Sequence, residues 1–192
     1  MEGYYYGVLD VYYALMKTDD TAAAAPTYDA PKVLGKSIEV TITPAYREGS
    51  LYASNAKVRD VKKIDSYGVK INADKIAADV QSEVLGRTTD ANGVQMIKGT
   101  NEPPKIAIGF ALTLDNGEKE LWWMYKGQLS EPSVTGKTDS DKMEYQTPSL
   151  EGNFVRRIYD DALAAVAETG VEGVKVTAES WFKAVYDGTT TE

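Results

Sequence analysis

The chain has 192 residues, of which 43% are hydrophobic and 26% are charged, and this length suits one globular domain. It contains no cysteine and no histidine, which excludes disulfides, Cys or His zinc sites and any mechanism that needs a thiolate or an imidazole. The 29 acidic and 21 basic residues give a net charge of -8, the wrong sign for a protein that grips a nucleic-acid backbone.

The first part of the chain predicts strands separated by an extended segment. Residues 7–16 are too uniformly apolar for periodicity to separate strand from helix, but their tyrosines and valines favour a strand. Residues 17–35 contain four consecutive alanines and two prolines, which indicates an extended N-terminal arm. Residues 36–43 alternate apolar and polar side chains and therefore predict a strand with one buried and one exposed face.

Residues 43–56 read as a loop that carries more aromatic side chains than a solvated connector needs. Residues 57–71 alternate again and predict one or two strands. A helix is expected over residues 72–85, because apolar residues recur four apart, Asn72 can cap its start and Gly86 follows its end.

A β-hairpin is the clearest element of the second half. Residues 106–114 and 118–128 flank an Asp-Asn-Gly turn, and each arm places large apolar side chains on one face. Trp122 and Trp123 must point to opposite faces of their strand, so at most one faces the core. We expect the other to lie at a subunit contact or under an arm.

The end of the chain is less clearly patterned. An extended run is expected near residues 143–150, whereas residues 152–169 fit either a helix or a return strand. Residues 170–192 form a C-terminal arm, in which Thr177 can cap a short helix that carries packed aromatics. Together the elements predict one mainly β domain with one or two helices, an α+β fold.

Four short motifs suggest binding or catalytic sites, but none has the spacing its chemistry needs. Residues 136–138 resemble the end of a phosphate loop, yet Glu131 stands where that loop needs glycine, and residues 90–93 lack the later ligands of a calcium loop. The acid pairs 139/141 and 160/161 have the residue type of a glycosidase, but nothing places them in a cleft. We therefore assign no catalytic, cofactor-binding or metal-binding residue and expect no enzyme.

Five phrases spread along the chain resemble the major tail tube proteins of long, non-contractile phage tails, especially those of phages and prophages of Gram-positive bacteria. The closing phrase and the one at residues 51–55 are the most specific, although family members often have aspartate where this chain has Ser54. The phrases are Tyr6-Gly-Val8 leading into Val11-Tyr12-Tyr13-Ala14; Thr27-Tyr28-Asp29-Ala30-Pro31; Leu51-Tyr52-Ala53-Ser54-Asn55; Pro132-Ser133-Val134 with Gly136-Lys137-Thr138; and Trp181-Phe182-Lys183-Ala184-Val185-Tyr186.

This resemblance implies a structural virion protein with a β-sandwich or half-barrel and a flanking helix. Six copies would close into a ring, and stacked rings would form the hollow tail tube through which DNA passes. The implied partners are further copies of the chain and the tail tip, tape-measure and tail terminator proteins. The implied location is the virion, after synthesis in the bacterial cytoplasm without membrane association.

The resemblance also assigns contacts between subunits. It implies that the loop at residues 43–56 and the terminal arms reach neighbouring subunits or rings. The candidate contact residues are Tyr46, Leu51, Tyr52, Trp181 and Tyr186. The alternative for the tyrosines is that they pack on their own subunit.

Two other functions remain open at this stage. A monomeric β-sandwich that binds carbohydrate or a cell surface would use exposed tryptophan and tyrosine as a platform. A carboxylate-based hydrolase would need two acids at a defined separation in a pocket.

Overall fold

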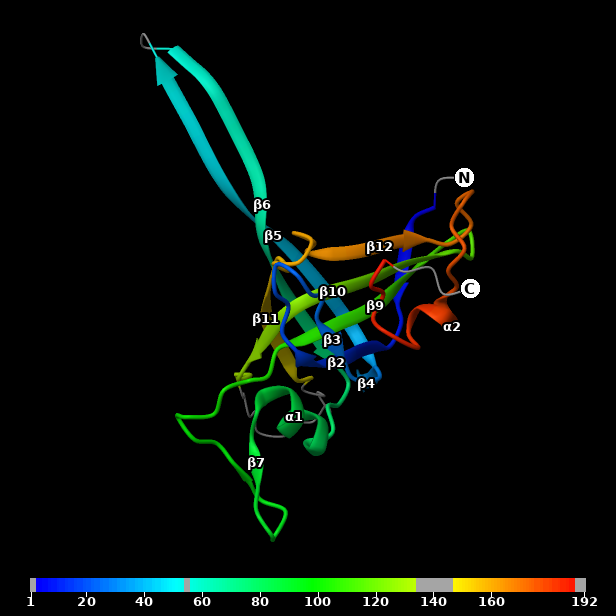
Figure 1. The fold of residues 1–192 in the computed structure, drawn as a ribbon. Helices are drawn as coiled ribbons and strands as arrows, with labels where there is room; N and C mark the ends of the chain where they lie inside the picture. Colours follow the sequence, from blue (N-terminus) through cyan, green and yellow to red (C-terminus); the bar gives the residue numbers. More distant parts are fainter. Residues whose placement is uncertain (1–2, 54–55, 134–146, 189–192) are drawn as a thin grey trace, which may run out of the picture.

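The computed structural model describes residues 3–53, 56–133 and 147–188, which form the mainly β fold expected from the sequence. Most strands belong to one antiparallel sheet, with two short helices beside it (Figure 1). The elements are β1 (Tyr5–Val8), β2 (Val11–Thr18), β3 (Thr27–Tyr28), β4 (Lys32–Gly35), β5 (Ser37–Ala53), β6 (Ala56–Ala73), α1 (Ala78–Leu85), β7 (Thr88–Thr89), β8 (Gln95–Met96), β9 (Ile106–Leu114), β10 (Lys119–Ser130), β11 (Ser149–Val155), β12 (Ala164–Glu168) and α2 (Ala178–Trp181).

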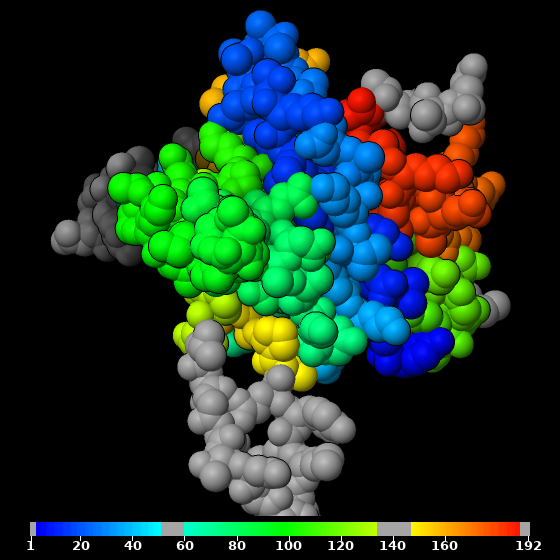
Figure 2. All heavy atoms as spheres, turned by 90° about the horizontal axis from the view of Figure 1, so that it is seen from below, coloured from blue at the N-terminus to red at the C-terminus, as the bar shows by residue number. Residues whose placement is uncertain are grey.

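The main sheet has the strand order β3-β2-β9-β10-β11-β6-β5. β1 and β2 lie end to end along one side of β9, and β12 and β11 lie end to end along one side of β10. β4 pairs with β2, while β7 and β8 form a separate small hairpin. Figure 2 shows α1 and the β7–β8 region as one block at the end of the molecule where β4 lies.

The β9–β10 hairpin at the centre of the sheet confirms the clearest prediction. Its turn contains Gly117 at a φ of 87°, a value that favours glycine. The two faces of the hairpin enter two different cores. Phe110 and Met124 contribute to the core on the α1 side of the sheet, and Leu121 and Trp123 contribute to the core on the α2 side.

Both tryptophan side chains of β10 pack against other residues of the same chain. Trp122 is half-buried and stacks on Phe110 at a ring-centroid distance of 5.9 Å. Trp123 is fully buried under the C-terminal segment, and its Nε1 donates a hydrogen bond to the carbonyl oxygen of Trp181 at 3.0 Å. The opposite orientation predicted for the pair is therefore confirmed, and Trp123 lies beneath an arm. The expectation that at most one of them faces the core was wrong, because the sheet has a core on each face and Trp122 packs against the other one.

The first helix is shorter than predicted. α1 begins at Ala78, because residues 72 and 73 remain in β6, where β5 and β11 bind their backbone. Asn72 therefore does not cap the helix, and its side-chain amide donates instead to Glu39 at 2.8 Å. The predicted end is confirmed, since Gly86 adopts a left-handed φ of 65° and closes the helix.

The two arms fold back onto the sheet. Within residues 17–35, β3 and β4 pair with β2, so this segment packs on its own sheet and is not a free arm. Residues 152–169, which fit either a helix or a return strand, contain the end of β11 and all of β12, so the strand alternative is correct. Thr177 and Ser180 form a capping box at the start of α2, as the sequence indicates, but the helix ends at Trp181.

Candidate assembly surface

The longest hairpin continues beyond the body of the sheet. β11 pairs with β6 only from Ser66 to Asn72, whereas β5 and β6 stay paired to their ends. Residues 46–53 and 56–64 therefore form a two-stranded ribbon without a third strand, which projects from the sheet in Figure 1. We call these residues the ribbon.

The loop predicted at residues 43–56 was wrong as local structure. Residues 43–53 belong to β5, and the strand runs on to Ala53. Side chains on both faces are exposed from residue 45 to residue 50. Because no face is buried there, the sequence lacks the apolar alternation by which a strand is recognised.

Cross-strand polar contacts organise the described part of the ribbon. Lys62 forms an ion pair with Glu48 at 2.9 Å, and its ammonium lies 4.2 Å from the ring centroid of Tyr46. Ser50 donates a hydrogen bond to Asp60 at 3.0 Å. Solvent screens such exposed contacts, so they set the geometry of the ribbon more than its stability.

The five predicted contact residues fall into two separate groups. Tyr46, Leu51 and Tyr52 lie along β5 in the ribbon, where Tyr46 is 47% exposed and the side chains of the other two are outside the described set. Trp181 is buried in the core on the α2 side, and Tyr186 stacks on it at 4.9 Å. In the single chain, this second group packs within its own subunit.

Several described strands pair on one side only, and two of them, β5 and β12, are of most interest for assembly. β5 pairs only with β6, which leaves its outer edge open, and β12 pairs only with β10. The N-terminal segment adds exposed aromatic surface, since Tyr4, just before β1, and Tyr6 within it are 78% and 72% exposed. Open edges and exposed aromatics are the features by which β-proteins associate.

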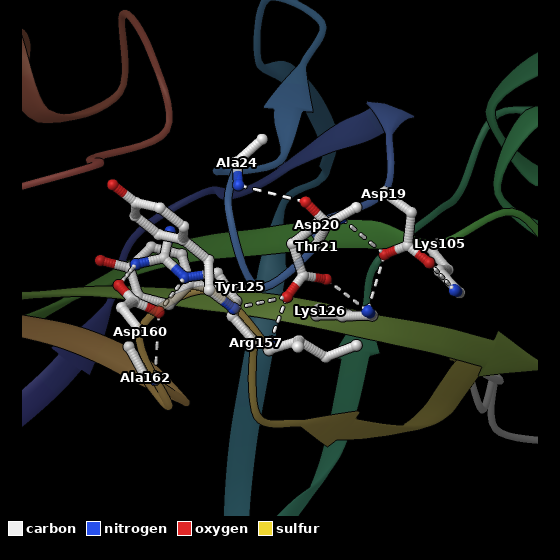
Figure 3. A network of polar contacts seen from close by, with 12 residues as sticks. Asp19, Asp20, Thr21, Ala24, Lys105, Tyr125, Lys126, Arg157, Asp160 and Ala162 are labelled. Atoms are coloured by element: carbon white, nitrogen blue, oxygen red, sulfur yellow. Dashed lines mark hydrogen bonds and ion pairs between the residues drawn. The ribbon is translucent and has the colours of Figure 1, made fainter.

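Sequence reasoning missed a buried ionic cluster around Asp20 (Figure 3). The fully buried Asp20 carboxylate accepts hydrogen bonds from Lys126 and from the backbone N–H groups of Ile158 and Tyr159. The neighbouring Asp19 forms an ion pair with Lys126 at 2.6 Å. The one feature of the sequence that could have indicated this cluster is Lys126, a charged residue within an otherwise apolar stretch of β10.

This cluster fixes the segment after β2 to the middle of the sheet. The Lys105 ammonium group forms a second ion pair with Asp19. The hydrogen bonds from Lys105 and Lys126 hold the pKa of the Asp19 carboxyl well below its usual range. The buried Arg157 guanidinium binds Asp160 and lies 3.7 Å from the ring centroid of Tyr125. The cluster around Asp20 thus joins the segment after β2 to β10 and to the residues after β11, and we call it the clamp.

The carboxylate pairs considered for catalysis do not form an acid pair where they are described. Asp160 is paired with Arg157 and Asp161 with Arg156, the latter at 2.9 Å. The pair at residues 139 and 141, like residues 136–138, lies outside the described residues. Asp90 instead accepts backbone hydrogen bonds at 2.8 and 2.9 Å within its own turn.

Within the described ranges, no group of three or more acidic side chains is arranged to hold a metal ion. Neither of the two helices there has the length and apolar character of a membrane-spanning helix. No protein-family model and no curated protein matches the chain at a significant level.

Proposed function

We propose that the chain is the subunit of a self-assembling tube of the phage tail type, in which hexameric rings stack around a channel for double-stranded DNA. The observation that carries this proposal is the projecting ribbon. With eight residues on its β5 side and about 3.4 Å per residue, it reaches about 27 Å beyond the sheet.

A ribbon of this kind is poorly stabilised in isolation. A two-stranded hairpin is at best marginally stable in water, and here neither face is buried over residues 45–50. An exposed tyrosine and two open backbone edges make it suited to contact another protein surface. A neighbouring subunit would supply the missing contacts.

The remaining open edges support closure into a ring. The sheet has an uncovered edge at β5 on one side and short strands on the other, so copies can associate through unlike surfaces. Contacts between unlike surfaces close into rings or continue as open assemblies. The net charge of -8 would let DNA pass without binding tightly.

The resemblance to tail tube proteins supplies the remaining partners in this proposal. Tail tip and tape-measure proteins would start assembly and set its length, and a terminator protein would end it. In this function the assembled tube lets DNA pass and catalyses no reaction. The alternative carbohydrate platform has less support, because Trp123 and Trp181 are buried and Trp122 is half-buried.

Negative-stain electron microscopy with light-scattering mass, across protein and salt concentrations, tests the proposal. We expect rings or hollow tubes with a central channel. Tyr46→Asp should suppress them, whereas Tyr159→Asp is a matched control because both side chains are 47% exposed. A protein that stays monomeric throughout, including with tail tip components as nuclei, would contradict the proposal, and a glycan-binding screen would then test the alternative.

A further inference from the structure

Two strand pairs place like charges directly opposite one another. Arg47 lies opposite Lys63 in the ribbon, and Glu120 of β10 lies opposite Glu168 of β12. Among the strand pairs of the described ranges, these are the only opposed like charges. Such pairs destabilise the sheet that contains them. The ribbon pair is positively charged and the β10–β12 pair is negatively charged. If the two pairs came together, each would neutralise the repulsion within the other.

The acidic pair is held in place, and no basic side chain of the described residues forms an ion pair with it. Glu120 accepts hydrogen bonds from Tyr5 Oη at 2.5 Å and from Trp122 Nε1 at 2.6 Å. The bond to Glu120 raises the pKa of Tyr5 to about 12, with burial contributing further. Glu168 has no hydrogen bond or ion pair with any described residue, so a cation could bind it without displacing an internal partner.

The acidic pair lies beside an open backbone edge. Tyr125 N–H donates to the Leu163 carbonyl, and Thr169 N–H donates to the Lys119 carbonyl, so odd-numbered residues of this segment bond to β10. The N–H and C=O groups of residues 164, 166 and 168 therefore point away from β10. Val166 is 49% exposed on the same face as the glutamates.

The ribbon has the complementary charge. It contains five basic and two acidic residues, a net charge of +3, so the rest of the chain carries -11 of the total of -8. Lys63 has no ion-pair partner among the described residues, and Arg47 pairs with Asp65 at 2.8 Å while remaining 73% exposed in its side chain. The ribbon is thus a basic, unsupported β-ribbon on an acidic protein.

We propose that the ribbon of one copy docks on the β12 edge of a second copy, with the Arg47–Lys63 pair facing the Glu120–Glu168 pair. The contact joins unlike surfaces, so each copy can give its ribbon to one neighbour and receive another's. Backbone pairing along β12 supplies affinity, and the charges select the partner and register. The inference rests on the proposed self-assembly and specifies one of its contacts.

A charge-exchange experiment tests this contact. Lys63→Glu and Glu168→Lys should each raise the protein concentration needed for assembly at least about tenfold, because each places like charges together. The double variant Lys63→Glu with Glu168→Lys should assemble as the unmodified chain does. Lys98→Glu and Glu172→Lys make the same changes in net charge at exposed positions elsewhere and should have little effect.

Light scattering and electron microscopy give the readout, with circular dichroism to verify folding. Normal assembly of both single variants, or loss without recovery in the folded double variant, would overturn the contact and leave self-assembly intact. If the unmodified chain forms no multimer under any condition, both proposals fail. Loss in each single variant with recovery in the double variant supports direct pairing.

Discussion

Asp20→Ala offers a direct measure of how much the buried clamp stabilises the fold. The substitution removes the acceptor of two backbone N–H groups, each worth about 1–3 kcal/mol when left unpaired in the interior. It also leaves Lys126, whose side chain is 8% exposed, with Asp19 as its only counter-ion in the cluster. Breaking a buried ion pair costs about 3–5 kcal/mol, and because these losses overlap we expect about 4 kcal/mol in total.

Urea denaturation followed by tryptophan fluorescence measures this loss of unfolding free energy. For a chain of this size, about 4 kcal/mol lowers Tm by about 8–16 °C. Asp29→Ala is the control, because Asp29 pairs at 2.7 Å with Lys17 at the surface, and it should cost less than about 1 kcal/mol. A loss below about 1 kcal/mol for Asp20→Ala would refute the interpretation of the cluster as a clamp.

Three further predictions concern the main sheet and the C-terminal segment that packs on it. Gly109→Ala would put a methyl group 2.8 Å from the ring of the buried Trp123, so the free energy of unfolding should fall by about 2 kcal/mol in urea melts. The hydrogen bond to Glu120 raises the pKa of Tyr5 to about 12, so the stability it contributes is complete below pH 10 and is lost as pH rises towards 12. Stability measured over that range should fall less steeply in Tyr5→Phe. Phe182→Ala should cost about 2 kcal/mol by removing a half-buried ring from the second core, and an unchanged Tm would contradict that packing.

Sequence patterns predicted the elements that combine regularly spaced apolar side chains with a clear turn or end signal. The β9–β10 hairpin has a strong alternation and an Asp-Asn-Gly turn, so its position could be read directly. That both of its faces are buried was not predicted. The end of α1 was readable because Gly86 supplies a conformation that other residues avoid. Its start was not, because pairing with neighbouring strands holds residues 72 and 73 in β6.

The candidate site was only partly predictable, for a related physical reason. Exposure of both faces removes the periodic signal from the β5 side of the ribbon, so its aromatic content was noticed but its strand structure was missed. The β6 side falls within residues 57–71, for which strands were predicted. Opposed charges such as Glu120 and Glu168 are 48 positions apart in the chain, and only the strand register brings them together. The clamp around Asp20 depends on equally distant partners, with Lys126 as its one local sign.

The place of β9 at the centre of the sheet has a consequence for the order of folding. β1 and β2 pair with β9, so they cannot join the main sheet until residues 106–114 have been synthesised, although β2 can pair with β3 and β4 earlier. The β5–β6 hairpin closes locally, in a process that takes microseconds once its residues are free. We therefore expect a nascent chain to present its ribbon before β10 and β12 exist, so that the two complementary surfaces appear at different times during synthesis.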